Sequence, residues 1–396
     1  MISRIVLFLT MLLVSLTPLR AVETSADDSL PPLPSVSLVT VFPGSEIYEL
    51  EGHTALRITD GHSDMAVNFG LFDFNSPNFV WRFVKGETDY MVGAYPWPYF
   101  VAGYAGSGRR IVQQPIELDR EQTRILLAAL AAQLTPPANT YRYNYVLDNC
   151  ATRPFDFIEK ALVPDSLVPA APAPELAGCD TFRKVMAWYH RNYPWYQFGI
   201  DLALGPLIDL PISRQAQLFA PVSLMQALEG SPHVGEAQEI VHGNPDGSAA
   251  AGPTAWLFSP MAVALAVFIA SVAVSVWDYR RRRLSRGFDA VLYGIFGLLG
   301  LLLAFLVFVS EHYATSPNYL IWWLNPLCLI PCIFIWSKRT KKVVFCYQIL
   351  NFAVLIGLII AWPFCVQSAN PAFWPLIAAD LVRAGSYVVN YKRLKK

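Results

Sequence analysis

The sequence has few charged residues and no excess of either sign. Asp, Glu, Lys and Arg make up 15% of the 396 residues, whereas about 25% is usual for soluble proteins. Lys and Arg number 30, as do Asp and Glu, so the formal net charge is zero. This balance gives no indication of a nucleic-acid partner. The apolar excess lies at the extreme N-terminus and beyond residue 254.

The N-terminus has the pattern of a secretory signal peptide over residues 1–21. Arg4 supplies the positive charge, and the apolar run Ile5–Leu16 is too short to span a bilayer comfortably. The stretch TPLRA predicts cleavage after Ala21. The polar, Pro-rich residues 22–35 then form a flexible leader, and the chain up to residue 254 lies outside the cytoplasm.

The C-terminal part, residues 255–396, is predicted to be an α-helical membrane domain with five spans. Each stretch is long enough to approach the ~30 Å thickness of a bilayer's hydrocarbon core. Asp380 and Arg383, which lie in the last stretch, either pair with each other or serve a function. The predicted spans are residues 255–277, 290–309, 319–336, 343–362 and 371–389.

The loops between these stretches predict their orientation. DYRRRRLSR, SKRTKK and the C-terminal YKRLKK are basic, whereas SEHYATSPN and PFCVQSANPAF contain no Lys or Arg. The positive-inside rule places the basic loops and the C-terminus in the cytoplasm. The signal peptide independently places the N-terminal half on the opposite side.

Residues 36–228 are predicted to form an α+β domain, joined to the membrane by a linker at 229–254. VSLVTVF at 36–42 predicts a strand, and residues 52–72 predict a hairpin with a turn at Asp60–Gly61. Two or three more strands are expected within 79–117. Helices are predicted at 118–137, with Asp119 and Gln122 as a capping box, at 150–162 and at 180–196.

Only two of the six cysteines, Cys150 and Cys179, lie outside the predicted membrane domain. In an oxidising compartment a disulfide between them is the default expectation. Cys150, however, lies at a predicted helix start, where the helix dipole lowers a thiol pKa and free N–H groups can bind an oxyanion. His53 in the hairpin is a candidate base, and Asn68 on the partner strand can orient its imidazole.

Several other polar residues are candidates for substrate binding. Arg57 shares a strand face with His53, and the outer loop that contains His312 is expected to face the catalytic domain. Against this, Arg153 and Asp156 are spaced as a structural ion pair, and a solvated loop histidine needs no function. The candidates are Arg57, Asn149, Arg153, His312 and Asn318.

This order, a histidine on a strand followed by NC at a helix start, resembles the circularly permuted papain-like fold of the NlpC and lecithin–retinol acyltransferase superfamily. Longer motifs, including FPGSEIYELEGHTALRI, YRYNYVLDNCATRPFD and SEHYATSPNYLIWWLNPLCL, resemble the Lnb family of bacterial membrane proteins over roughly residues 36–390. The resemblance implies an extracytoplasmic papain-like domain on a multi-span inner-membrane domain, with Cys150 as nucleophile and His53 as base.

The resemblance also implies lipoprotein N-acyltransferase activity. The acyl donor is then a membrane phospholipid, or the lipoprotein's own diacylglyceryl group, and the acceptor is the α-amine of a diacylglyceryl-lipoprotein's N-terminal cysteine. A thioester mechanism requires no metal and no cofactor. Two alternatives stay open: a thiol amidase or peptidase acting on cell-wall peptide, and a non-enzymatic envelope assembly module with a Cys150–Cys179 disulfide.

Overall fold

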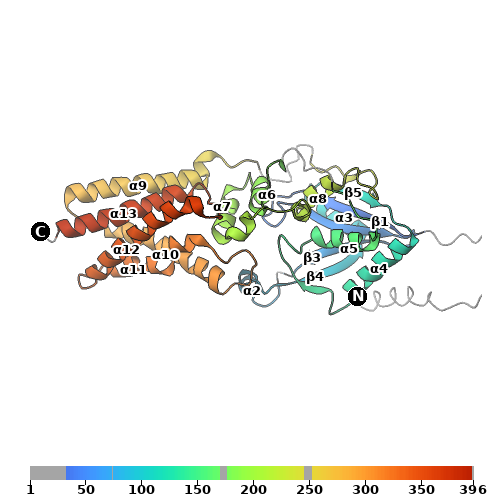
Figure 1. The fold of residues 1–396 in the computed structure, drawn as a ribbon, viewed down its shortest axis with the longest axis horizontal. Helices are drawn as coiled ribbons and strands as arrows, with labels where there is room; N and C mark the ends of the chain where they lie inside the picture. Colours follow the sequence, from blue (N-terminus) through green and yellow to red (C-terminus); the bar gives the residue numbers. More distant parts are fainter. Residues whose placement is uncertain (1–32, 74, 170–175, 245–251, 395–396) are drawn as a thin grey trace, which may run out of the picture. The chain divides into compact units, whose positions relative to one another are not determined.

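The computed structural model describes residues 33–73, 75–169, 176–244 and 252–394. Within them, an N-terminal region built on a β-sheet precedes a helical C-terminal region (Figure 1). The protein is therefore of the α+β class. The predicted signal peptide and the leader up to residue 32 lie outside the described residues.

The N-terminal region is organised around one antiparallel sheet with the strand order β6-β4-β3-β2-β1-β5-β7. The predicted strand at 36–42 and the hairpin at 52–72 are confirmed as β1, β2 and β3. Successive apolar residues of these strands point to opposite faces of the sheet, and each face packs against a hydrophobic core. A shift of one residue would exchange the two faces, so this packing fixes the pairing register of the strands. The strands are β1 Ser35–Val41, β2 His53–Thr59, β3 Asp64–Leu71, β4 Asp89–Pro96, β5 Ile111–Ile116, β6 Thr140–Arg142 and β7 Gln238–Val241.

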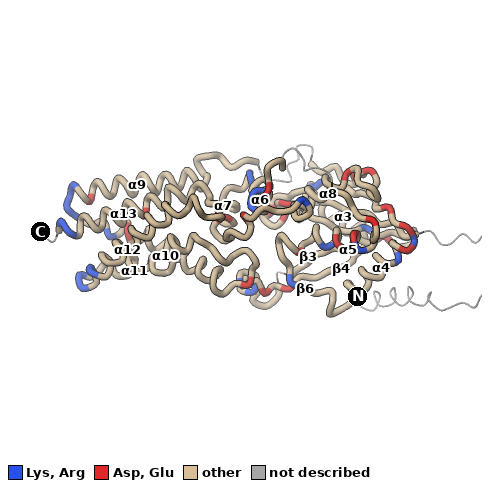
Figure 2. Tube along the Cα trace, in the orientation of Figure 1, with Lys and Arg blue, Asp and Glu red and all other residues tan. Residues whose placement is uncertain are grey.

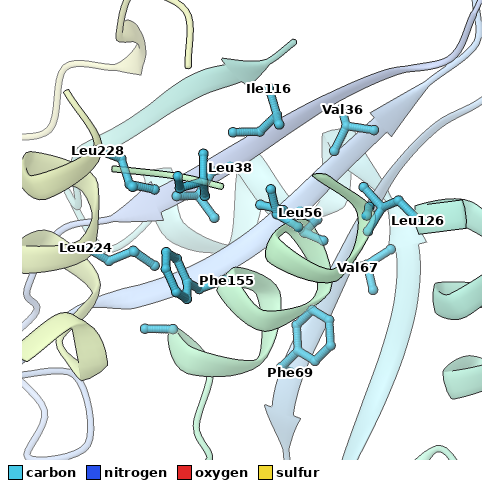
Figure 3. Close-up of a cluster of buried hydrophobic side chains, with 14 of the residues drawn as sticks. Val36, Leu38, Leu56, Val67, Phe69, Ile116, Leu126, Phe155, Leu224 and Leu228 are labelled. Carbon is cyan, nitrogen blue, oxygen red and sulfur yellow. The ribbon is translucent and has the colours of Figure 1, made fainter. Parts of the chain in front are cut away.

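One face of the sheet is covered by three helices, α4 (Arg120–Leu134), α5 (Thr152–Leu162) and α8 (Pro221–Leu228). Figure 3 shows their side chains, including Phe155 and Leu224, packed with strand residues. Burying such a side chain stabilises the fold by about 1.5–3 kcal/mol. The predicted capping box of α4 is confirmed, since Asp119 accepts from the Gln122 N–H and the Gln122 side chain accepts from the Asp119 N–H.

The opposite face is covered by α3 (Trp97–Ala105), whose Trp97 and Phe100 pack on Val39 and Ala55. The segment 79–117 contains the expected strands but also α3 and a short helix, α2 (Phe79–Lys85). The strand interpretation missed α3 because its aromatic residues also suit strands. Prolines at its start favour the helix.

Two further predictions need correction. The helix expected over 180–196 ends at Tyr189 as α6 (Phe182–Tyr189), because Pro194 starts a new helix, α7 (Pro194–Ala203). The linker expected over 229–254 contains β7, which pairs with β5 and forms one edge of the sheet.

The C-terminal region contains three helices that are long and apolar enough to cross a membrane: α9, α10 and α12. The predicted third span is broken into 3-10 turns and the short α11, and prolines at 326 and 331 account for the interruption. The last helix, α13, carries buried charges. The helices are α9 Pro260–Arg281, α10 Arg286–Phe308, α11 Leu329–Phe334, α12 Lys341–Ala361 and α13 Phe373–Arg393.

Arg383 and Asp380 do not pair with each other. Arg383 donates to Asp289 at 2.7 Å and to Asp278 at 3.0 Å, tying α13 to α10 and α9. Asp380 accepts instead from Asn351 of α12 at 2.7 Å. Figure 2 shows Lys and Arg residues at the turn after α9, at the start of α12 and at the end of α13, as the predicted cytoplasmic loops require.

Candidate active site

Cys150 lies at the start of α5, two residues before its first helical residue, and is 8% exposed. The turn that holds it is built by Asn149, whose Oδ1 accepts the N–H groups of Ala151 and Thr152 at 2.8 and 3.0 Å. The Asn149 amide nitrogen donates to the carbonyls of Tyr145 and Phe219, both at 2.8 Å. Asn149 therefore positions the cysteine and has no donor left for a substrate.

Two groups from other elements donate toward the thiol. The Tyr143 hydroxyl lies 3.9 Å from the Cys150 Sγ, and the backbone N–H of Thr54 lies close enough to the sulfur to act against the rise in its pKa. The pairing of β2 with β3 ends at Ala55, which lies opposite Asn68. The next residue, Thr54, therefore has no β3 partner for its backbone N–H. The backbone N–H of Thr54 at this end of the sheet is therefore directed at the Cys150 sulfur.

Gly70 allows Tyr143 to reach this position. Its φ is 83°, a conformation that favours glycine, and an added Cβ would lie 2.8 Å from the Tyr143 ring. The pairing of β3 with β4 shifts register between Asn68 and Leu71, next to this residue. The irregular end of β3 therefore provides the space in which the tyrosine approaches Cys150.

The expected low thiol pKa is not found. Burial is the largest influence and raises the pKa of Cys150 above its usual value, outweighing the hydrogen bonds from Thr54 and Tyr143. The helix-start argument failed because the side chain of Asn149 already uses the first free N–H groups. The resting Cys150 side chain is therefore a protonated thiol, and it would require a base to act as a nucleophile.

His53 is oriented by Asn68, with 3.0 Å between the imidazole Nε2 and the Asn68 Oδ1. The Asn68 amide nitrogen points to the Ala66 carbonyl at 3.4 Å, which fixes its oxygen toward the histidine. Nε2 therefore carries the proton and Nδ1 keeps its lone pair. Burial, more than the nearby Arg109 charge, lowers the pKa of His53 to about 4, so the ring is neutral at neutral pH.

His53 directly precedes Thr54 on β2, and both His53 and Cys150 interact electrostatically with Arg109. Among the described residues no hydrogen bond joins the two side chains. Catalytic hydrogen bonds are often long in unliganded enzymes and tighten when substrate binds. The Tyr104 ring stacks on the His53 imidazole, with 6.0 Å between the ring centroids.

Arg109 is a site residue that sequence reasoning missed. It is 2% exposed, donates to the Phe42 carbonyl and to Glu49 at 2.8 Å each, and lies over the Tyr104 ring. Its charge opposes protonation of His53 and attracts a Cys150 thiolate. No local motif indicated this role, because Arg109 approaches the site from the start of another strand.

A second buried histidine, His190, lies in the same region. Its Nε2 is 2.6 Å from a Glu51 carboxylate oxygen and its Nδ1 is 2.8 Å from the Gln197 Oε1. Gln197 donates its own amide nitrogen to Asp201, so its oxygen must face the imidazole. Both ring nitrogens of His190 are therefore engaged by fixed partners, and neither is free to act as a base on a substrate.

The polar groups behind His190 continue to the membrane region. One carboxylate oxygen of Asp201 accepts hydrogen bonds from the side chains of Gln197 and Arg183. The other accepts one from the Asn370 amide nitrogen at 2.8 Å. Asn370 belongs to the segment between α12 and α13. This network connects the neighbourhood of Glu51, whose charge also raises the pKa of Cys150, to the membrane helices.

Two predicted substrate-binding arginines are occupied elsewhere. Arg57 forms a two-point ion pair with Asp64 at 2.8 Å and contacts Trp97, on the face of the sheet covered by α3. Arg153 pairs with Asp148 rather than with Asp156, the partner its helical spacing suggested. The structure does not bring either guanidinium to the thiol.

His312 and Asn318 also have structural partners. His312 Nε2 donates to the Phe83 carbonyl of α2 at 2.7 Å. Asn318 is 2% exposed, and its amide donates to the Leu202 carbonyl at 2.9 Å and accepts from Gln367. These residues fasten the outer loop of the membrane region to the N-terminal region, away from Cys150.

Cys150 and Cys179 are both free thiols and belong to different hydrophobic clusters. The disulfide expected by default is therefore not formed. Within the described residues, no group of three or more His, Cys, Asp or Glu side chains is arranged to hold a metal ion.

Two family descriptions match the chain in succession. The Lnb N-terminal periplasmic domain matches residues 28–186, and the Lnb transmembrane domain matches residues 253–394. The chain belongs to the Lnb family. As an Lnb protein it is an inner-membrane protein with a periplasmic N-terminal domain. No curated protein matches it, and no solved structure does.

Proposed function

We propose that this Lnb protein is a lipoprotein N-acyltransferase with Cys150 as its nucleophile. The acyl chain moves from a membrane glycerolipid, or from the lipoprotein's own diacylglyceryl group, to the α-amine of the lipidated N-terminal cysteine. The observation that carries the proposal is a free, buried thiol at a helix start, with the Tyr143 hydroxyl directed at its sulfur, and a neutral histidine, His53, that is oriented by Asn68 and shares the neighbours Tyr104 and Arg109 with the thiol. Attachment to membrane helices supports a lipid substrate.

In the first half-reaction, the Nδ1 of His53 removes the proton of Cys150 as the sulfur attacks an ester carbonyl. A C–S bond forms and the ester C–O bond breaks, so that the acyl group is held on Cys150 as a thioester. The departing alkoxide takes the proton from His53. Asn68 stabilises the imidazolium that forms in between. The low pKa of His53 makes this proton easy to return to the leaving group.

In the second half-reaction, the neutral α-amine of the acceptor attacks the thioester and His53 removes one of its protons. The C–S bond then breaks, and that proton returns to the sulfur. The product is an amide, and Cys150 is again a thiol. Because the thioester keeps the activation of the ester it replaced, the cycle needs no external energy source.

The negative charge that develops on the carbonyl oxygen needs donors close to the sulfur. We assign this role to the Tyr143 hydroxyl and the Thr54 N–H, the two groups that donate toward the Cys150 Sγ. Burial raises the pKa of Tyr143 well above its usual value, so its hydroxyl remains a donor at any working pH. Such preorganised donors are among the largest contributions to acyl-transfer catalysis.

The finer architecture is part of the same proposal. The periplasmic domain, residues 36–228 together with β7, is a circularly permuted papain-like fold, supported by the order of His53 on a strand and Cys150 at a helix start. The helices from α9 to α13 cross the membrane five times, with the interrupted segment around α11 as the third span. The basic turns in Figure 2 support a cytoplasmic C-terminus.

Mass spectrometry of a reporter lipoprotein's N-terminus tests this function. A host that depends on this protein should show N-acylated lipoprotein with the unmodified chain and a free α-amine with Cys150→Ala or His53→Ala. Unchanged N-acylation in the Cys150→Ala strain would contradict the proposal. Loss of cell-wall peptide cleavage with no effect on lipoproteins would instead indicate a thiol amidase.

A further inference from the structure

A line of aromatic side chains begins beside Cys150 and continues to α2. Neighbouring ring centroids are 4.5 Å apart at Tyr143–Tyr90, 5.3 Å at Tyr90–Phe72, and 5.9 Å at both Phe72–Phe79 and Phe79–Phe83. None of the five side chains is fully buried. We call this set the aromatic file; its members are Tyr143, Tyr90, Phe72, Phe79 and Phe83.

The outer end of the aromatic file lies on a helix with an unusually apolar surface. α2 has no buried residue, and Val80, Trp81 and Phe83 are 73%, 58% and 46% exposed. The Trp81 ring packs on Phe305 with 5.1 Å between centroids. Phe305 lies near the end of α10, one of the helices long and apolar enough to span a membrane, and tryptophan is enriched at the membrane–water interface that such a helix end reaches. Together these features indicate a short helix set into the membrane surface.

The position of α2 is fixed by the loop that follows α10. The Glu311 N–H donates to the Lys85 carbonyl at 2.7 Å, the His312 Nε2 to the Phe83 carbonyl at 2.7 Å, and the Ser310 hydroxyl to the Val84 carbonyl at 3.0 Å. An added Cβ at Gly86 would lie 2.9 Å from the His312 nitrogen, so glycine is required for this close contact. The apolar face of α2 is therefore held in place by the membrane region.

We propose that α2 and the aromatic file form the access route along which an acyl chain of a membrane glycerophospholipid reaches Cys150. This inference rests on the proposed function. A thiol in a periplasmic domain can attack a lipid ester only if the acyl chain leaves the bilayer, and an apolar surface is needed because each CH₂ group exposed to water is costly. The aromatic file supplies such a surface, one end beside the sulfur and the other at the lipid.

Photo-crosslinking tests the route without relying on turnover. Full-length Cys150→Ala protein is placed in vesicles that contain a phosphatidylglycerol with a diazirine on one acyl chain. After irradiation, peptides that cover residues 72–90 should carry the label, and Trp81→Glu should remove most of it. Label confined to α9–α13 would overturn the proposal.

A comparison of donors tests its role in catalysis. Trp81→Glu and Phe79→Ala should each lower the rate of Cys150 acylation by a long-chain phospholipid at least tenfold, while the rate with p-nitrophenyl acetate stays within twofold. Tyr99→Ala, which truncates a 74% exposed aromatic residue on α3, is the matched control and should change neither rate. Equal losses with both donors, or no loss with the phospholipid, would contradict the route.

The two proposals fail in different ways. If unmodified protein never carries an acyl group on Cys150 but lipid still crosslinks to residues 72–90, the acyltransferase proposal fails and the lipid-binding surface stands. If Cys150 is acylated but neither crosslinking nor the variants implicate α2, the access route fails and the acyltransferase proposal stands.

Discussion

Two of the histidines in the periplasmic domain, His53 and His190, have opposite surroundings. His53 is paired with an amide, keeps a free lone pair on Nδ1 and is neutral. His190 is paired with Glu51 through one ring nitrogen and with Gln197 through the other, so neither nitrogen is free. The difference shows that the partners of an imidazole decide its role: a single amide partner leaves one nitrogen free to act as a base, whereas a carboxylate and an amide together occupy both nitrogens.

The largest effect is expected from removing the base. His53→Ala should lower kcat/KM for acyl transfer by about 10²–10⁴-fold, the usual contribution of a general base, and should shift Tm by no more than a few degrees. The measurement pairs a donor-release assay with thermal unfolding in detergent. An active His53→Ala variant that loses activity only when His190 is also changed would reverse the roles assigned to the two histidines.

Removing a donor beside the sulfur should have the next largest effect. Tyr143→Phe keeps the ring in the aromatic file but deletes the hydroxyl, and should lower kcat by about 10²-fold, at the lower end of the range seen for loss of one oxyanion donor. Its matched control is Tyr90→Phe, which alters a neighbouring ring without a contact to the sulfur. Equal losses in the two variants would assign Tyr143 a packing role.

For His190 the expected loss is in stability rather than chemistry. His190→Ala leaves the buried Glu51 carboxylate without its partner, and breaking such a buried pair typically costs about 3–5 kcal/mol. The folded fraction should retain kcat/KM within about threefold. Chemical denaturation followed by tryptophan fluorescence gives the first quantity, and titration of active thiols normalises the second. A stable but inactive variant would contradict this assignment.

The pH profile is the finest test of the comparison. Because the pKa of His53 is lowered to about 4, the acidic limb of kcat/KM should fall near pH 4 rather than near the usual value of 6.5. Below that limb the base is protonated and cannot accept the thiol proton. Asn68→Asp gives His53 a carboxylate partner, as His190 has, and should move the limb upward. An unshifted limb in this variant would show that His53 is not the titrating base.

Much of the fold was predictable because its signals are local. The hairpin of β2 and β3 has alternating residues around an Asp-Gly turn, and α4 has its own capping box, so both followed from adjacent residues. α3 was missed because its aromatic residues also suit strands, and β7 because its Gly- and Pro-rich surroundings resemble a linker.

The candidate site divides in the same way. His53, Asn68 and Cys150 could be proposed from strand and helix positions, since hairpin register places Asn68 near His53. The roles of Arg109 and of the Glu51–His190 pair depend on contacts between distant segments, 60 and 139 residues apart in the chain, which no local pattern encodes. The thiol pKa was predicted in the wrong direction, because burial and the use of free N–H groups by Asn149 appear only in three dimensions.

The most direct test of the account is the covalent intermediate itself. Protein incubated with phospholipid and no acceptor is digested and analysed by mass spectrometry, before and after treatment with neutral hydroxylamine. The peptide that contains Cys150 should gain the mass of one acyl chain and lose it with hydroxylamine, and the His53→Ala variant should show no adduct. Full N-acylation by the Cys150→Ala variant, or an adduct only on Cys179, would contradict the account.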